Sequence, residues 1–368
     1  MRISMKKGKL ILLLTADYEI FGNGSGYVNH CLINPAEEIM ITCERYKSRV
    51  TFFFDVCEYW AFLEVEKKGL FSEGYQPATI IKNQLQDAVR RGHDVQLHFH
   101  PQWLDYKFIG DQKWELNYDY WRVSQMPVQS GGKVMSLKEL FVKGKETLEN
   151  MLQPISPDYK CRAFRAGAWC IQPEKEVIKV LEEVGIKYDT TVAPGIKIDD
   201  GVTKCDFLGA PFKIAQWNIL DKVIEPNDKG NVIEVPIFSS NLSAARSNMY
   251  RALKLARGSY KSPIGCTGKP LTAEITKNSP KSLLVKVKGG SQMFDFCGGA
   301  TFEEMRYMLN TAKRRFRELL KVSDVPVVAI GHPKNFGSSK ELDKLLLKMS
   351  KRKSVRLDLL SEKSFWQT

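Results

Sequence analysis

The feature that most constrains the fold of this chain is a regular alternation of short apolar runs with segments of helical spacing. Each apolar run has the length of a buried strand and ends in polar residues. Strands are predicted over 10–14, 50–54, 95–97, 161–164, 186–188, 232–235, 325–330 and 355–359. Helices are predicted between them, over 78–91, 137–151, 173–184, 301–320 and 339–349. This alternation favours an α/β fold with a parallel sheet covered by helices, closed or open.

Two stretches do not follow the alternation. Residues 104–136 are rich in Tyr and Trp, and residues 196–300 are basic and dotted with Gly, Ser and Pro. Neither stretch has an apparent core of its own. We therefore expect one domain over 1–368, with insertions at about 104–136 and 196–300 on the face that carries the chemistry.

The net charge of +13 and the pI near 9.2 favour an anionic partner, such as a phosphorylated substrate, a phospholipid surface or nucleic acid. The excess is concentrated in residues 250–289, which hold nine basic side chains and one acidic side chain. A solvated basic face is the alternative explanation. Nucleic acid is the least favoured partner, because no nucleic-acid-reading motif accompanies the charge.

The cysteines and the N-terminus predict a cytoplasmic location, with peripheral contact to the inner face of the membrane as an extension. Eight cysteines form no Cys-x-x-Cys pair, which is typical of reduced, buried thiols. The first apolar run is short, lacks a small-residue cleavage site and leads directly into Asp17 and Glu19, so it is interpreted as a strand rather than a signal peptide. The unbroken apolar runs fall far short of the roughly 20 residues needed to cross a bilayer.

Chemically capable side chains follow five of the predicted strands. In parallel α/β folds the carboxyl ends of the strands meet on one face, where active sites form. We therefore expect a site built from Asp17, Glu19, His98, His100, Arg165, Asp189 and His332.

The spacing of these residues indicates metal chemistry. His98 and His100 lie two apart, so on extended backbone both imidazoles face the same way. A carboxylate from another strand end would complete a three-ligand face, for which zinc is the default metal. Asp17 and Glu19 can divide the roles of metal ligand and proton acceptor, although a solvated turn is the alternative. Arg165 can orient a carboxylate, or serve as a structural ion pair.

Taken in their order along the chain, these motifs resemble those of the NodB-homology polysaccharide deacetylases, carbohydrate esterase family 4 and its relatives. The first family motif, TFDDG, resembles the segment Thr15-Ala16-Asp17-Tyr18-Glu19, and the histidine motif resembles residues 92–101. RAGAW, which begins at Arg165, takes the place of RPPYG, and Asp189 and the His332 of IGHP match the last two motifs. The resemblance spans nearly the whole chain outside the insertions and implies a distorted (β/α)7 barrel.

The resemblance also implies roles for the site residues. It implies a metal-dependent hydrolase that cleaves a carbon–nitrogen amide bond and holds one divalent metal. Its ligands would be Glu19, His98 and His100, with Asp17 as base, Arg165 as the group that positions it, His332 as general acid and Asp189 as a support for His332. Trp103 and Trp169 are expected to contact the sugar, and Trp114 and Trp121 are also suited to stacking on sugar rings. Core packing is the alternative role for Trp103, Trp114 and Trp121, and it is the favoured one for each taken singly.

Three departures from the family pattern leave alternatives open. The metal histidines are two apart rather than four, so Gln102 can replace His100 as a ligand. Glu19 sits one residue later than the family Asp, so Asp17 and Glu19 can exchange roles. RAGAW lacks the Pro-Pro-Tyr that shapes the acyl pocket, which leaves the acyl group open.

The resemblance implies a substrate as well. The expected activity is removal of an N-acyl group, N-acetyl by default, from a sugar in cell-surface polysaccharide biosynthesis. A lipid-linked or nucleotide-linked saccharide would account for the positive charge. The alternative is a catalytically inactive carbohydrate-binding protein on the same barrel. The sugar, the metal and the oligomeric state are not specified by the sequence.

Overall fold

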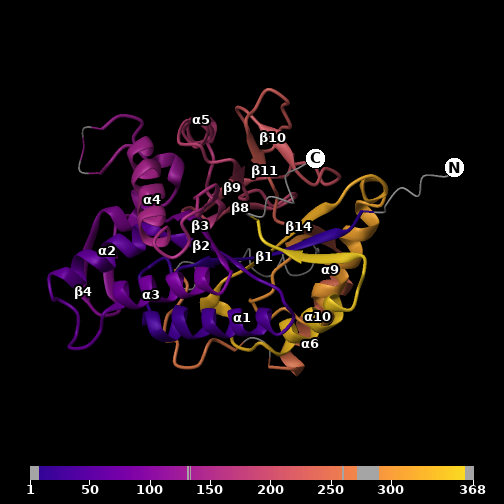
Figure 1. The fold of residues 1–368 in the computed structure, drawn as a ribbon, viewed down its shortest axis with the longest axis horizontal. Helices are drawn as coiled ribbons and strands as arrows, with labels where there is room; N and C mark the ends of the chain where they lie inside the picture. Colours follow the sequence, from indigo (N-terminus) through magenta and orange to yellow (C-terminus); the bar gives the residue numbers. More distant parts are fainter. Residues whose placement is uncertain (1–7, 131, 133, 259–260, 272–289, 361–368) are drawn as a thin grey trace.

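A computed structural model describes residues 8–130, 132, 134–258, 261–271 and 290–360. Its centre is a curled, mainly parallel sheet of nine strands (Figure 1). The parallel strands lie in the order β11 (Val232–Glu234), β7 (Tyr188–Asp189), β6 (Ala163–Ala166), β3 (Asp94–Phe99), β2 (Thr51–Asp55), β1 (Leu10–Tyr18) and β14 (Val325–Gly331). The antiparallel β10 (Trp217–Ile219) flanks β11, and β15 (Val355–Asp358) pairs with the first half of β1.

The two sides of this sheet are joined by irregular backbone pairing. Ile237, just after β11, forms a parallel bridge to Val328 of β14, and Asp295 forms one to Ile330. The amide N–H of Phe238 also donates to the carbonyl of Val328 at 2.9 Å. The sheet therefore closes on itself, and the predicted distorted (β/α)7-type barrel is confirmed.

The strands at the centre of the sheet are buried on both faces, which explains their almost continuous apolar sequence. Every residue of β1, β2, β3, β6 and β14 is buried. All the predicted strands are present, but β1 and β3 extend further than the apolar runs, so Asp17 and His98 lie inside their strands. Asp17 and His98 can be buried at these positions because each has polar partners inside the barrel.

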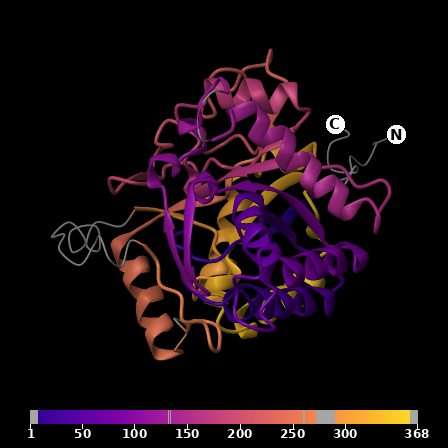
Figure 2. The ribbon, with the colours of Figure 1, turned by 90° about the vertical axis from the view of Figure 1, so that its left-hand side faces the viewer.

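The helices lie around the outside of the sheet (Figures 1 and 2). Five confirm predicted helices: α3 (Pro77–Arg90), α4 (Leu137–Leu152), α5 (Lys175–Glu183), α9 (Phe302–Arg315) and α10 (Lys340–Ser350). Two of these helices begin with a capping box, formed by Ser136 and Glu139 at α4 and by Thr301 and Glu304 at α9. Among the described residues, three further helices were not predicted: α1 (Asn34–Glu44), α2 (Val56–Lys67) and α6 (Ala244–Ala256). Helix α2 buries residues on several sides and so shows no clear apolar stripe.

The two expected insertions contribute differently to the structure. The first contains the hairpin of β4 (Tyr106–Gly110) and β5 (Lys113–Leu116), whose Trp114 packs on Phe62 and Trp103. The second contains β8 (Lys197–Asp199), β9 (Lys204–Asp206), β12 (Ser239–Leu242), β13 (Gly290–Met293) and α6. It also contains β10 and β11, which belong to the main sheet. The second range is therefore partly barrel, and the division into one domain with insertions stays a prediction.

The expectation that all the cysteines are reduced is wrong for one pair. Cys31 and Cys266 form a disulfide across 235 residues of sequence, while Cys43, Cys57, Cys161, Cys170, Cys205 and Cys297 are buried free thiols. Sequence spacing could not reveal the pair, because the two cysteines meet only through the fold. Disulfides are typical of oxidising compartments. The cysteine content therefore no longer supports a cytoplasmic location.

The basic stretch over residues 250–289 is partly neutralised by ion pairs in the part that the structure describes. Lys254 is buried and pairs with Glu304, and Arg257 pairs with Glu303 and Glu341. Lys277, Lys281, Lys286 and Lys288 lie outside the described residues. Among the described helices, none combines the length and apolar character that crossing a bilayer would require.

The disulfide predicts a simple thiol count. Protein purified without reductant and then unfolded in urea should react with a thiol reagent at six cysteines, and at eight after reduction. A Cys31→Ser/Cys266→Ser double variant should give six under both conditions. Eight reactive thiols in the unreduced wild-type protein would show that the pair is not formed.

Candidate active site

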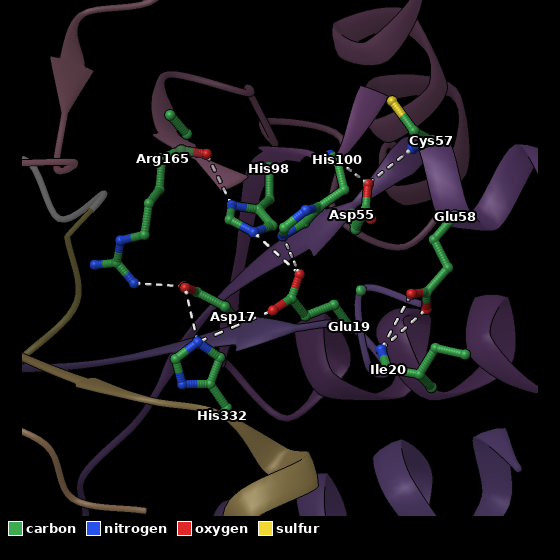
Figure 3. Close-up of polar contacts among 12 residues, drawn as sticks. Asp17, Glu19, Ile20, Asp55, Cys57, Glu58, His98, His100, Arg165 and His332 are labelled. Atoms are coloured by element: carbon green, nitrogen blue, oxygen red, sulfur yellow. Dashed lines mark hydrogen bonds and ion pairs between the residues drawn. The ribbon is translucent and has the colours of Figure 1, made fainter. Parts of the chain in front are cut away.

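The carboxyl ends of four barrel strands bring the predicted site residues together (Figure 3). Asp17 lies near the end of β1, and Glu19 directly follows that strand. His98 lies in β3, Arg165 in β6, and His332 follows β14. Because the strands run parallel, side chains separated by more than 300 residues of sequence meet on one face.

Glu19, His98 and His100 form a buried cluster that could hold a cation. One ligand atom from each lies within 4.8 Å of the other two. Oε2 of Glu19 is 3.4 Å from Nε2 of His98 and 2.5 Å from Nε2 of His100. Both Nε2 atoms are buried and neither makes a hydrogen bond of acceptable geometry. Two buried imidazole nitrogens aimed at one carboxylate oxygen fit a divalent metal such as zinc.

Surrounding groups fix the orientation of the two imidazoles. Nδ1 of His98 lies 2.8 Å from the carbonyl oxygen of Arg165, which leaves Nε2 facing the cluster. The backbone N–H of His100 donates to Asp55, which also caps helix α2 through Cys57. Burial raises the pKa of Asp55 to about 7, although His100 opposes the shift. Gln102 contacts Nδ1 of His100 with its side-chain amide at 3.2 Å, so it sits behind His100.

Asp17 forms a buried ion pair with Arg165. The two side chains are 3% and 0% exposed, and Nη1 of Arg165 donates to Oδ1 of Asp17 at 2.6 Å. Arg165 also donates to the hydroxyl of Thr15 and to the carbonyl of Thr190. Burial alone would raise the pKa of Asp17, but the charges of Arg165, His98 and His332 hold it well below its usual value. Asp17 is therefore ionised and held in one orientation.

His332 faces Asp17 from the opposite side of the site (Figure 3). Its Nε2 lies 3.4 Å from Oδ2 of Asp17 and 3.9 Å from Oε1 of Glu19. Its side chain is 17% exposed, which makes it more accessible than the three candidate ligands. An imidazole in this position can exchange protons with a group bound in the pocket.

Lys334 is a site residue that sequence reasoning missed. Its Nζ lies 2.6 Å from Oε1 of Glu19 and donates to the carbonyl of Ile20 at 2.8 Å. Burial alone would raise the pKa of Glu19, but His100 and Lys334 hold it well below its usual value. The signal was its position two residues after His332, the same spacing as between Asp17 and Glu19.

The site opens into a pocket of about 200 Å³. Trp121 and Trp169 line it, and the Trp121 ring lies 5.7 Å from that of His100. The indole nitrogens of both tryptophans are buried without a hydrogen-bond partner. Trp103 is placed elsewhere: it is 1% exposed and packs in the core against Phe62. The expected sugar contact at Trp103 is therefore corrected to a packing role.

Asp189 does not lie beside His332 as expected. It is fully buried, accepts a hydrogen bond from Thr191 at 2.6 Å and shares a side-chain hydrogen bond with Glu234. Burial raises the pKa of Asp189 to about 6 and raises that of Glu234 well above its usual value. Ionisation of two neighbouring carboxyl groups in a buried place is disfavoured, which favours the protonated form. Asp189 therefore belongs to a buried acidic pair behind Arg165 rather than to the support of His332.

Gly167 explains why small residues follow Arg165. A Cβ at this position would lie 2.3 Å from the carbonyl oxygen of Phe99 and 2.9 Å from Nδ1 of His100. The next two residues, Ala168 and Trp169, have positive φ angles of 51° and 57°. This left-handed turn carries Trp169 to the pocket wall, and non-glycine residues in that region occur preferentially at functional sites.

Comparisons with known proteins give a similarity of fold. No family model matches the sequence, and no curated protein matches it. Among solved structures, the chain is similar to a Mycobacterium smegmatis protein described as a polysaccharide deacetylase, with 11% identity over 98% of this chain and 90% of that one and a TM-score of 0.46. A Bacillus cereus polysaccharide deacetylase gives 10% identity, 98% and 94% coverage and a TM-score of 0.38. The allantoinase Puue is 9% identical over 96% of this chain and 88% of that one, with a TM-score of 0.43. At these sequence identities and TM-scores the similarity concerns the fold alone, and the chemistry depends on the residues of the site.

The close approach at Gly167 predicts the effect of adding one methyl group. Gly167→Ala should displace the His100 ring, lower the free energy of unfolding by about 1–3 kcal/mol and weaken zinc binding. Gly110→Ala is the matched control, because nothing lies within 4 Å of its Cβ position. Urea unfolding and chelator competition measure the two effects. Equal behaviour of the two variants would contradict the packing described here.

The buried acidic pair predicts a pH dependence of stability. The folded state keeps a proton at Asp189 that the unfolded chain releases above about pH 4, so this residue stabilises the fold at low pH. That stability, about 3 kcal/mol at most, is lost as the pH rises toward 6. Asp189→Asn should therefore gain stability relative to wild type between pH 4 and 6, whereas the exposed Asp228→Asn should not. Urea unfolding at several pH values measures this, and a pH-independent difference would contradict it.

Proposed function

We propose that this protein is a metal-dependent hydrolase that removes an N-acyl group, N-acetyl by default, from a sugar. The observation that carries the proposal is the meeting of two groups of side chains at one pocket. Glu19, His98 and His100 offer a three-ligand face, and the Asp17–Arg165 ion pair and His332 lie beside it. This is the combination that amide hydrolysis needs: a cation site, a base and an acid.

Glu19, His98 and His100 would hold the metal, with zinc as the default for two imidazoles and one carboxylate. A divalent cation bound there supplies Lewis acidity to the acyl carbonyl and makes water in the site easier to deprotonate. The geometry favours Glu19 over Asp17 as the ligand, because Asp17 is engaged by Arg165. Glu19 is therefore the ligand and Asp17 the base in this proposal.

The remaining side chains perform the proton transfers. Asp17 accepts a proton from the attacking water, and Arg165 keeps it ionised and aligned. His332, on the open side of Asp17, donates a proton to the nitrogen of the departing sugar amine. General acid–base catalysis of this kind contributes about 10²–10⁴-fold to the rate.

The pocket supports a sugar as substrate. Trp121 and Trp169 line the pocket and give it the aromatic surface on which sugar rings stack. A role in cell-surface polysaccharide biosynthesis, and a lipid-linked or nucleotide-linked saccharide, remain part of the proposal because of the +13 charge. Arg251, Lys261 and Lys269 are exposed members of the basic stretch over residues 250–289.

A carbohydrate-binding protein without catalytic activity is the second candidate. The observation that favours it is the ion pair of Lys334 with Glu19, which gives the carboxylate a counter-charge without any metal. Metal content separates the two candidates. Stoichiometric zinc after loading and dialysis supports the hydrolase, and its absence supports the binding protein.

The hydrolase proposal predicts the effect of removing the base. Asp17→Asn should lower acetate release from N-acetylated sugars, offered free, as oligosaccharides and linked to nucleoside diphosphates, by about 10²–10⁴-fold. It should retain zinc, because Asp17 is not a ligand. Lys340→Met, which removes an exposed charge outside the pocket, should leave the rate unchanged. Zinc-loaded wild-type protein that releases no acetate from any of these sugars would contradict the proposal.

A further inference from the structure

The two oxygens of Glu19 have different partners. Oε2 faces the imidazoles of His98 and His100, whereas Oε1 lies 2.6 Å from Nζ of Lys334. The Lys334 side chain is only 12% exposed, and its ammonium is also held by the carbonyl of Ile20. This is a built contact rather than a chance surface pair.

Lys334 changes the charge that a cation would meet. Each pocket carboxylate at the centre of the site already faces a basic side chain: Asp17 faces Arg165, and Glu19 faces Lys334. A divalent cation beside Oε2 would therefore meet a neutralised carboxylate, with an ammonium on the other oxygen of the same group. The ammonium of Lys334 and a divalent cation, both bound to one buried carboxylate, would repel each other strongly.

Lys334 also orients Glu19, and the two effects on cation binding oppose each other. A hydrogen bond to the second oxygen of a ligand carboxylate supports its orientation, and loss of such support typically costs 10–100-fold in metal affinity. Repulsion between a monovalent and a divalent cation that share one buried carboxylate is the larger effect, because both charges are shielded from water.

We propose that Lys334 is an internal counter-ion for Glu19 that competes with the divalent cation for this carboxylate. This inference rests on the proposed metal site. Cation binding then requires the Lys334–Glu19 ion pair to open, and the released ammonium turns toward the pocket that its side chain already lines. The residue sets the metal affinity of the site and acts through Glu19, so it is a positioning residue.

The test compares the zinc affinity of full-length variants at pH 7 and low ionic strength, by competition with a chromophoric chelator. Lys334→Met should bind zinc at least about tenfold more tightly than wild type, because the competing charge is gone. Lys334→Gln, which keeps a donor for the carbonyl of Ile20, should do the same, and it serves if the Met variant does not fold. Lys334→Arg should stay close to wild type, and the exposed Lys340→Met should not differ from it.

The outcomes separate this inference from the proposed function. Wild-type protein that binds zinc, together with Lys334→Met and Lys334→Gln variants of equal or weaker affinity, would overturn the role of Lys334 and leave the metal site standing. Wild-type and variant proteins that all fail to bind zinc would overturn both. Tighter binding in both neutral variants, with Lys334→Arg near wild type, supports the competition.

Discussion

The buried ion pair between Arg165 and Asp17 is the interaction on which the site is built. Arg165 reaches from β6 across the barrel to Asp17 in β1 and also binds Thr15 and Thr190. An unpaired charge in this position would be strongly destabilising, so the two strand ends must meet. The backbone carbonyl of the same arginine holds the ring of His98. One residue thus fixes the proposed base with its side chain and one proposed metal ligand with its backbone.

Around this pair, several buried polar side chains have charged or polar neighbours. Glu19 lies between two imidazoles and Lys334, and Asp55 holds the backbone of His100. Burial raises the pKa of Asp189 and of Glu234. The barrel end therefore shifts its carboxyl groups in opposite directions: the pKa is lowered at Asp17 and Glu19 and raised within the buried pair. Environment rather than residue type assigns these roles.

Local patterns in the sequence were sufficient to predict a parallel α/β sheet and a group of polar residues at the ends of its strands, and the family resemblance implied the barrel. Apolar runs identify buried strands, and the residues that end them must gather on one face. Contacts that depend on tertiary packing were not predictable in this way. The Cys31–Cys266 disulfide, the Glu234 partner of Asp189 and the core position of Trp103 each join segments whose relation only the fold sets. Lys334 was missed because its spacing from His332 is a weak signal, and its contact with Glu19 joins segments that only the fold brings together.

Anomalous scattering from crystals grown with zinc tests the central claim most directly. The account predicts one strong peak at the zinc edge within bonding distance of Oε2 of Glu19 and Nε2 of both His98 and His100, with Asp17 still bound to Arg165. A peak bound by other residues, or no peak at this cluster in crystals of zinc-loaded protein, would contradict it.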